Sequence, residues 1–397
     1  MLKKIKFVLP ILLIGLLMGP FSSYLFISIL HFPVVVPELF FIPFFFIYYA
    51  KFGIKLKYKP VFNVVIYLWL LFLLIALLWD TWSFMAVFST GRSFLILGLF
   101  YIIGKCVKCN DSLFRLLLLL SIGSIVGWVI RSYMNFITLS LTSGFEESVV
   151  YGNMIAIAFA FSISLLIKSN YITIFLVFAL NVFLSFTTAL RRQIMVSLMS
   201  LGLSLSLLTV KYNKIGYLLV LLLLFIPVYL ALPQIESTIA DVSPNMHKRI
   251  FVRSQNLLEG NLGNSEQGRA EKQYKIFTEF DKLIIPHGYV SQQTSKDANT
   301  GIFNDVPIYM LSYTFGVIII LIYLILFFRK LLRALRYFLG TGNAYYGVIF
   351  VVGSIVLFLH LVDSQMFTVS YSAPFTGLII GLLFRSDYLE NESKYSL

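Results

Sequence analysis

The sequence has few charged residues. Asp, Glu, Lys and Arg make up 12% of its 397 residues, whereas 59% are hydrophobic and the mean hydropathy is +0.89. Soluble globular proteins carry about 25% charged residues. No soluble fold could bury this much apolar surface, so the composition predicts an all-α integral membrane protein.

The sequence also has only two cysteines, Cys106 and Cys109. They form a CxxC pair in a short basic loop. Two cysteines are too few for a disulfide framework, and the further ligands that a zinc site needs are missing near them. The motifs GxSxG, HExxH, a Walker loop and GxGxxG in a strand context are absent, which leaves soluble-type hydrolase, protease or nucleotide chemistry without support. The net charge of +13 forms no patch with interleaved aromatic residues, so we expect membrane lipids and no nucleic acid as partners.

Instead, the chain has many apolar runs close to the ~20 residues that cross a bilayer. They predict twelve transmembrane helices, at 7–30, 33–50, 61–79, 84–104, 112–131, 149–167, 170–189, 193–210, 215–232, 307–328, 344–362 and 366–384. The first run has a basic start but no small-residue cleavage motif after it. We interpret it as a retained span and not as a signal peptide.

Lysines and arginines predict the orientation, because cytoplasmic loops are enriched in them. With both termini in the cytoplasm, residues 1–232 hold spans one to nine, and residues 307–397 hold spans ten to twelve with a cytoplasmic tail. Residues 233–306, the long segment, then lie outside the cytoplasm. We expect it to contain an amphipathic helix over Arg269–Leu283, lying on the membrane body or on the membrane surface, and a weaker one over His247–Leu258.

Four arginines outside the long segment break the positive-inside pattern. Arg191 and Arg192 lie at an outer junction between two spans, where they either bind an external anion or extend to the lipid headgroups. Arg131, at the end of its span, is either an interfacial anchor or a ligand of the same anion. Guanidinium groups stay charged and bind phosphate with two hydrogen bonds, which suits a lipid pyrophosphate.

Arg92 lies inside the run 84–104. It is either buried in a span or follows a re-entrant stretch, with a short helix beginning at Ser93. Both alternatives point a cation at the interior of the bundle. The residue serves either a binding site or a structural ion pair with Asp80 or Glu38.

Two further residues could transfer protons. Asp305 precedes the tenth span, where a carboxylate could accept a proton from a sugar hydroxyl, although it could equally be the acid that precedes a helix beginning at Pro307. His287, in IIPHGYV, is either a second proton-transfer group or a solvated loop histidine.

Four local patterns resemble the O-antigen polymerase and O-antigen ligase superfamily of membrane glycosyltransferases. They are YGNMIAIAFA around Asn153, the looser TTALRRQ, the stretch from Gly268-Arg269 to Pro286-His287-Gly288, and the junction from Asp305 to Gly316. The ligases usually carry a His-Asn pair where this chain has Asp305-Val306. That difference favours a polymerase.

The resemblance implies a GT-C-like helical bundle in the bacterial inner membrane that works without a metal or other cofactor. Its substrates would be undecaprenyl-pyrophosphate-linked oligosaccharides on the periplasmic face, and a chain-length regulator protein would be a candidate partner. Arg191, Arg192 and Arg92 would hold the pyrophosphate, Arg269 would orient a diphosphate or sugar, and Asp305 would deprotonate the acceptor hydroxyl. Two rivals remain: a ligase that transfers the polymer to lipid A core, and a flippase for lipid-linked saccharides.

Overall fold

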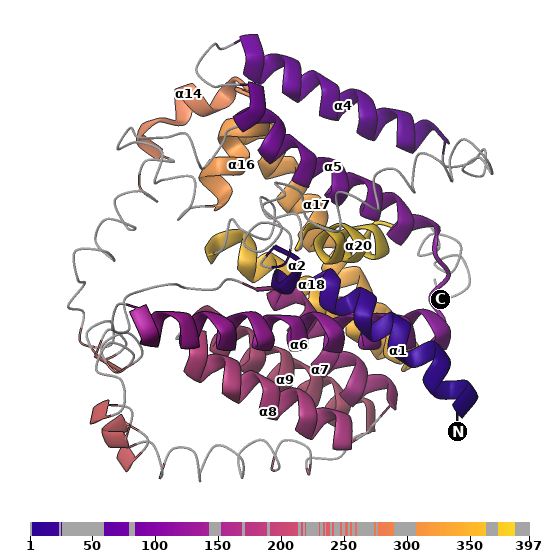
Figure 1. Cartoon of the computed structure of the whole chain (residues 1–397). Coiled ribbons are helices and arrows are strands. Elements are labelled where there is room, and N and C mark those ends of the chain that lie inside the picture. The colour runs from indigo at the N-terminus through magenta and orange to yellow at the C-terminus, as the bar shows by residue number, and fades with distance from the viewer. Residues whose placement is uncertain are drawn as a thin grey trace. The chain divides into compact units, whose positions relative to one another are not determined.

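A computed structural model shows helices in every regular element of the residues that it describes (Figure 1). Those residues are 2–23, 59–78, 84–142, 152–168, 171–188, 191–212, 277–289, 307–362 and 372–385, with isolated positions between them. The helices are α1 (Leu2–Leu17), α2 (Pro20–Ser23), α4 (Lys59–Leu78), α5 (Phe84–Cys106), α6 (Asp111–Thr142), α7 (Met154–Ile163), the π-helix η3 (Ser164–Lys168), α8 (Tyr171–Thr188), α9 (Arg191–Tyr212), α14 (Phe280–Ile284), α16 (Pro307–Phe315), α17 (Val317–Thr341), α18 (Ala344–Val362) and α20 (Ala373–Leu383).

The helices form two compact units. Unit 1 consists of Met1–Ile29, Phe114–Gly268 and Arg336–Ile355, and unit 2 consists of Leu30–Leu113, Arg269–Leu335 and Val356–Leu397. Unit 1 therefore holds α1, α2, α7, α8, α9 and most of α6 and α18. Unit 2 holds α4, α5, α14, α16, α20 and most of α17.

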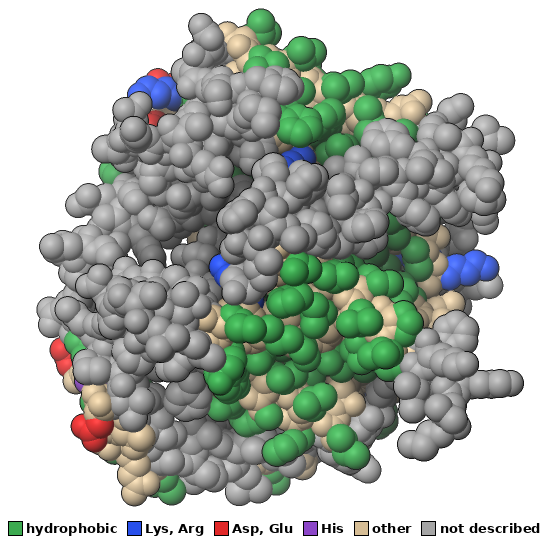
Figure 2. Space-filling model, in the orientation of Figure 1, with side chains coloured by type: hydrophobic (Ala, Val, Ile, Leu, Met, Phe, Trp, Pro, Cys, Tyr) green, Lys and Arg blue, Asp and Glu red, His purple; other side chains and the backbone are tan. Residues whose placement is uncertain are grey.

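Four described helices are long and apolar enough to cross a membrane. They are Pro60–Leu78, Asp111–Met134, Arg192–Tyr212 and Ala344–Val362. These helices indicate a membrane protein, as the composition predicts, and all regular elements of the described residues are helical. Hydrophobic side chains gather on the outside as well: Figure 2 shows such a surface over α1 and the neighbouring part of unit 1, where Leu9 and Leu13 are exposed.

Helix α4 shows how lipid and protein faces are divided. Its exposed apolar residues recur at helical spacing, at Val64, Tyr67, Leu68, Leu71, Leu74 and Leu78, whereas Phe72 and Ala76 are buried. In water such an exposed stripe would be unfavourable, but in a bilayer it faces hydrocarbon. The opposite side of α4 packs against α5.

Helices α1 and α6 approach closely through paired small residues. Gly15 on α1 lies against Gly123 on α6, and an added Cβ at either would overlap the backbone of the other helix; one turn further along, Gly19, just after α1, and Gly127 on α6 make similarly close contacts. Four-residue spacing of glycines lets membrane helices pack backbone to backbone. Close van der Waals packing of this kind stabilises helix contacts in a bilayer, because burial away from lipid gives no hydrophobic driving force.

Several predicted spans coincide with helices, and three differ in an informative way. The run 7–30 breaks after α1, because Pro20 has no N–H and disfavours helical backbone at Gly19. The run 307–328 breaks at Gly316, whose φ is +90°, into α16 and α17. The run 112–131 is too short, since α6 continues to Thr142. The predicted span 33–50 and most of 215–232 lie outside the described residues.

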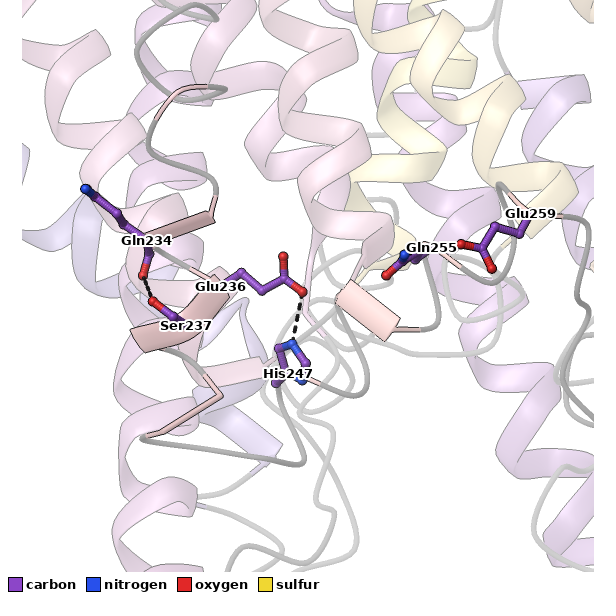
Figure 3. Close-up of polar contacts among 6 residues, drawn as sticks. All are labelled: Gln234, Glu236, Ser237, His247, Gln255 and Glu259. Carbon is purple, nitrogen blue, oxygen red and sulfur yellow. Dashed lines mark hydrogen bonds and ion pairs between the residues drawn. The ribbon is translucent and has the colours of Figure 1, made fainter.

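Within unit 1, short polar contacts join described positions of the long segment (Figure 3). Glu236 Oε1 lies 3.1 Å from His247 Nε2. Gln255 Nε2 donates to Glu259 Oε1 over 3.2 Å, across the four-residue spacing of one helical turn. The latter contact lies at the end of the stretch where the sequence predicts a weak amphipathic helix.

Candidate functional site

Arg92 lies within α5, which runs without interruption from Phe84 to Cys106. The continuous helix rules out the re-entrant alternative, because no short helix begins at Ser93. The Arg92 side chain is half-buried, and its Nε atom is buried. Since an arginine at the centre of a bilayer costs about 2.5–3.5 kcal/mol, its position favours a functional or ion-pairing role.

The turn of α5 that carries Arg92 packs against segment 285–289 of unit 2. The ring of Tyr289 stacks on Phe94 with 5.2 Å between centroids. A Cβ added at Gly91 would lie 3.0 Å from the same tyrosine ring, so the absence of a side chain at Gly91 allows this close approach. The aromatic contact places segment 285–289 beside the backbone next to Arg92.

Backbone hydrogen bonds attach this segment to the end of α16. The N–H of His287 donates to the carbonyl of Tyr313 over 2.9 Å, and the N–H of Gly288 donates to Thr314 over 3.2 Å. Gly288 has a φ of +78°, and its Cα lies against the α4 backbone. The structure thus brings the segment of His287 and the helix turn of Arg92 to one part of unit 2.

The His287 ring is held by stacking. It lies on the ring of Tyr313 with 4.1 Å between centroids and 19° between the ring planes. Burial lowers the pKa of His287, and backbone hydrogen bonds at Ile285 and Tyr313 raise it by less. The imidazole is therefore neutral at pH 7 and can accept a proton at one nitrogen.

A carboxylate that was not among the predicted site residues lies in the same unit. The hydroxyl of Tyr309 donates to Glu279 Oε2 over 2.7 Å. Tyr309 and Tyr313 are four residues apart on α16 and share a face, so the glutamate and His287 contact neighbouring turns of one helix. Glu279 and Tyr309 are thirty residues apart in the sequence, so no spacing rule predicts their contact. The feature of the sequence that indicates a polar face here is the pair of tyrosines four residues apart after Pro307.

The apolar side chains around Glu279 point away from unit 2. Tyr274, Phe277 and Ile285 are more than half exposed, whereas Leu283 is fully buried. Of the two places open to the predicted amphipathic helix, these exposed residues favour the membrane surface over the membrane body. The described helical part, α14, is shorter than the predicted Arg269–Leu283.

The neutral state of His287 predicts a local loss of stability in acid. Because its folded pKa lies below the ordinary value of about 6.5, the unfolded chain binds the proton more tightly, and stability falls as the pH drops below about 6.5. Hydrogen exchange of a peptide covering 284–290 should accelerate more between pH 7.5 and 5.5 in the wild type than in His287→Gln, after correction for intrinsic rates. Equal acceleration in both proteins would contradict the prediction.

In unit 1, the two predicted outer arginines open a helix. Helix α9 begins at Arg191, and Arg192 is half-buried; the side chain of Arg191 lies outside the described residues. Just after them, the buried Gln193 donates to the carbonyl of Asn181 over 3.2 Å and Ser197 donates to Asn181 Oδ1 over 3.3 Å. This polar cluster joins α8 and α9 beneath the first turn that carries both arginines.

Arg131 and Asn153 also belong to unit 1. Arg131 is half-buried and lies inside α6, not at the end of the helix as the predicted span implied. Asn153 caps α7, because its Oδ1 accepts a hydrogen bond from the N–H of Ala156 over 3.1 Å. Helix α7 therefore begins directly after this asparagine, within the predicted span 149–167.

The remaining predicted site residues, Asp305 and Arg269, lie outside the described residues. Among the described residues, no group of three or more His, Cys, Asp or Glu side chains could hold a metal ion. Comparisons of the chain with protein-family models, curated proteins and solved structures found no match.

Proposed function

We propose that the chain is a membrane glycosyltransferase that polymerises O-antigen or a related surface polysaccharide. It would transfer a growing glycan from undecaprenyl pyrophosphate to the next lipid-linked repeat unit. One observation carries this proposal: a guanidinium, that of Arg92, lies inside a continuous apolar helix whose turn packs against segment 285–289 of the long segment. Together they support a site where a cation inside an apolar helix meets the long segment.

The proposed reaction needs a charged leaving group to be stabilised. The acceptor hydroxyl oxygen attacks the anomeric carbon, the bond from that carbon to the pyrophosphate oxygen breaks, and the hydroxyl proton goes to a carboxylate. Arg92, Arg191 and Arg192 would neutralise the departing pyrophosphate, whose negative charge increases in the transition state. Asp305 would accept the proton, and Arg269 would orient a diphosphate or sugar.

The described polar contacts of unit 2 add to this scheme. The Glu279 carboxylate, bonded to Tyr309, and the neutral His287, stacked on Tyr313, lie on adjacent turns beside α16. The neutral imidazole of His287 can accept a proton. The two groups support a site at which a hydroxyl nucleophile is activated without a metal ion.

The proposal includes a detailed topology. Twelve spans would form a GT-C-like bundle in the bacterial inner membrane, with both termini in the cytoplasm and residues 233–306 in the periplasm.

Surface lipopolysaccharide from a deletion strain tests the function. Core carrying a single repeat unit is the result expected of a missing polymerase. Core alone with accumulated lipid-linked polymer would identify a ligase, and core alone with undecorated precursor on the cytoplasmic face would identify a flippase. In the complemented strain, Arg191→Ala and Arg192→Ala should each abolish polymer at normal expression. Normal chain length in both variants would overturn the leaving-group role.

A further inference from the structure

The two cysteines lie in the loop that joins α5 to α6. Cys106 is the last residue of α5 and is exposed, whereas Cys109 is half-buried. Asn110 follows, and its Oδ1 accepts a hydrogen bond from the N–H of Leu113 over 2.9 Å, which caps the start of α6. Cys109 therefore precedes the positive end of a helix dipole.

A buried arginine reaches this loop from the end of α20. Arg385 is only 7% exposed, and its Nη1 donates both to the carbonyl of Val107 and to Cys109 Sγ, 3.0 Å away. A sulfur that accepts from a guanidinium N–H is electrostatically suited to carry negative charge. The contact therefore favours the thiolate form of Cys109 over the thiol.

Rigid packing holds the arginine in place. Gly104 on α5 meets Gly381 on α20 so closely that a Cβ on either would overlap the opposite backbone. Arg385 comes two residues after Leu383, the last residue of α20, and the N–H of Phe384 still donates to Ile380. Since both helices end at this contact within unit 2, the geometry around Cys109 is set by the fold.

The charge around the loop is mainly positive. Lys105 and Lys108 flank the cysteines, and Asp111 in the first turn of α6 is the acidic residue on the flanking elements. The Lys105 ammonium lies over the Tyr101 ring, 5.5 Å from its centroid. Reactive cysteines are found in electropositive, partly exposed surroundings of this kind.

We propose that Cys106 and Cys109 are a thiol–disulfide exchange site for small-molecule disulfides, with Cys109 as the attacking sulfur. The Cys109 thiolate attacks one sulfur of the external disulfide, forms a mixed disulfide and releases the first thiolate. Cys106 then loses its proton, attacks the Cys109 sulfur and releases the second thiolate. The two cysteines are oxidised by two electrons, the external disulfide is reduced to two thiols, and the two cysteine protons end on them.

Oxidation would also alter the anchor at the end of α20. A disulfide sulfur carries no negative charge, so Arg385 would lose an acceptor that balances its own charge. Arg385 would then be held less firmly to the loop. This site does not depend on the proposed glycosyltransferase activity.

The test uses the full-length protein in detergent and an excess of an aromatic disulfide whose released thiolate absorbs visible light. The wild type should release two thiolates per chain and end two hydrogen masses lighter, without an adduct. Cys106→Ser should release one thiolate and keep the adduct on Cys109. Cys109→Ser should react on the order of tenfold more slowly at pH 7.

Variants of Arg385 show whether it speeds the reaction of Cys109 through its charge or by changing the exposure of the sulfur. Arg385→Gln, studied in the Cys106→Ser background, should slow Cys109 by roughly tenfold at pH 7, and Arg385→Lys should slow it less. At pH 9.5 ordinary thiols are largely ionised, so the difference should shrink there. A slow rate that persists at pH 9.5 would show a change of exposure and overturn the role of Arg385. Two adducts retained on the wild type, or a faster Cys106, would overturn the exchange site.

Discussion

Arg92→Ala is expected to abolish polymer without loss of folded protein. Removing a donor that stabilises a developing charge lowers catalysis by about 10²–10³-fold. The folded protein should be unharmed, because an alanine replaces a half-buried cation inside an apolar helix. A loss of activity at equal or greater stability is the signature of a functional arginine.

Two further variants make this test specific. Arg92→Lys keeps the charge but not the planar fork that binds phosphate with two hydrogen bonds, so we expect shorter or scarcer polymer. Arg115→Ala removes an exposed arginine from α6 on the side predicted to be cytoplasmic and should leave chain length unchanged. The measurements are polymer length on gels, membrane expression and the melting temperature in detergent.

The alternative role of Arg92 predicts the opposite combination. If the guanidinium serves a structural ion pair, Arg92→Ala leaves a buried carboxylate behind, which is strongly destabilising. Expression and melting temperature would then fall together with the polymer, and Arg92→Lys would restore both. Such a result would remove Arg92 from the proposed pyrophosphate site.

Helix positions were the most predictable part of this chain. Hydropathy alone predicts a span at 344–362, and α18 covers the same residues. It predicts a span at 170–189, and each end of α8 lies within one residue of that range. The apolar run length carries this information because only a helix satisfies its backbone within the bilayer. The helix start at Met154, capped by Asn153, lies inside the predicted span 149–167, because a run of apolar residues does not mark the capping residue.

The predicted helix ends were wrong where the backbone conformation changes without a change in hydropathy, or where hydropathy changes within a helix. The run 307–328 stays apolar across Gly316, so its hydropathy does not reveal a residue with positive φ. Helix α6 continues through the more polar residues after Arg131, because polarity ends a hydrophobic run without ending a helix. Proline marks such a break only in part: α1 ends before Pro20, but it continues through Pro10.

The candidate site was only partly predictable. The arginines that break the positive-inside pattern could be selected from the predicted topology, because that pattern is read from single positions. The contact of Tyr309 with Glu279 and that of Arg385 with Cys109 join residues far apart in sequence, at 2.7 and 3.0 Å. Such long-range contacts depend on how the helices pack, so they cannot be predicted from a single sequence.

Gly288→Ala is expected to be the most damaging single-methyl change in unit 2. A non-glycine residue at a φ of +78° costs about 1–2 kcal/mol. The added Cβ would also overlap the backbone oxygen of Phe72 and the side chain of Ala76 on α4, and overpacking adds about 1–3 kcal/mol. Because α4 is a long helix held on one side by α5, it cannot move away cheaply.

The effect should extend to the site through the neighbouring hydrogen bonds. Displacing Gly288 breaks its bond to Thr314 and pulls the N–H of His287 from Tyr313, so the stacked imidazole loses its support. We expect a lower melting temperature, faster hydrogen exchange over 284–290 and little polymer. Gly202→Ala is the matched control, because nothing lies within 4 Å of a Cβ at that position of α9, and a helical Gly→Ala change is neutral or stabilising by about 0.5–1 kcal/mol. Equal melting temperatures for the two variants would mean that segment 285–289 does not contact α4. That result would also contradict the placement of this segment beside the α5 turn that carries Arg92.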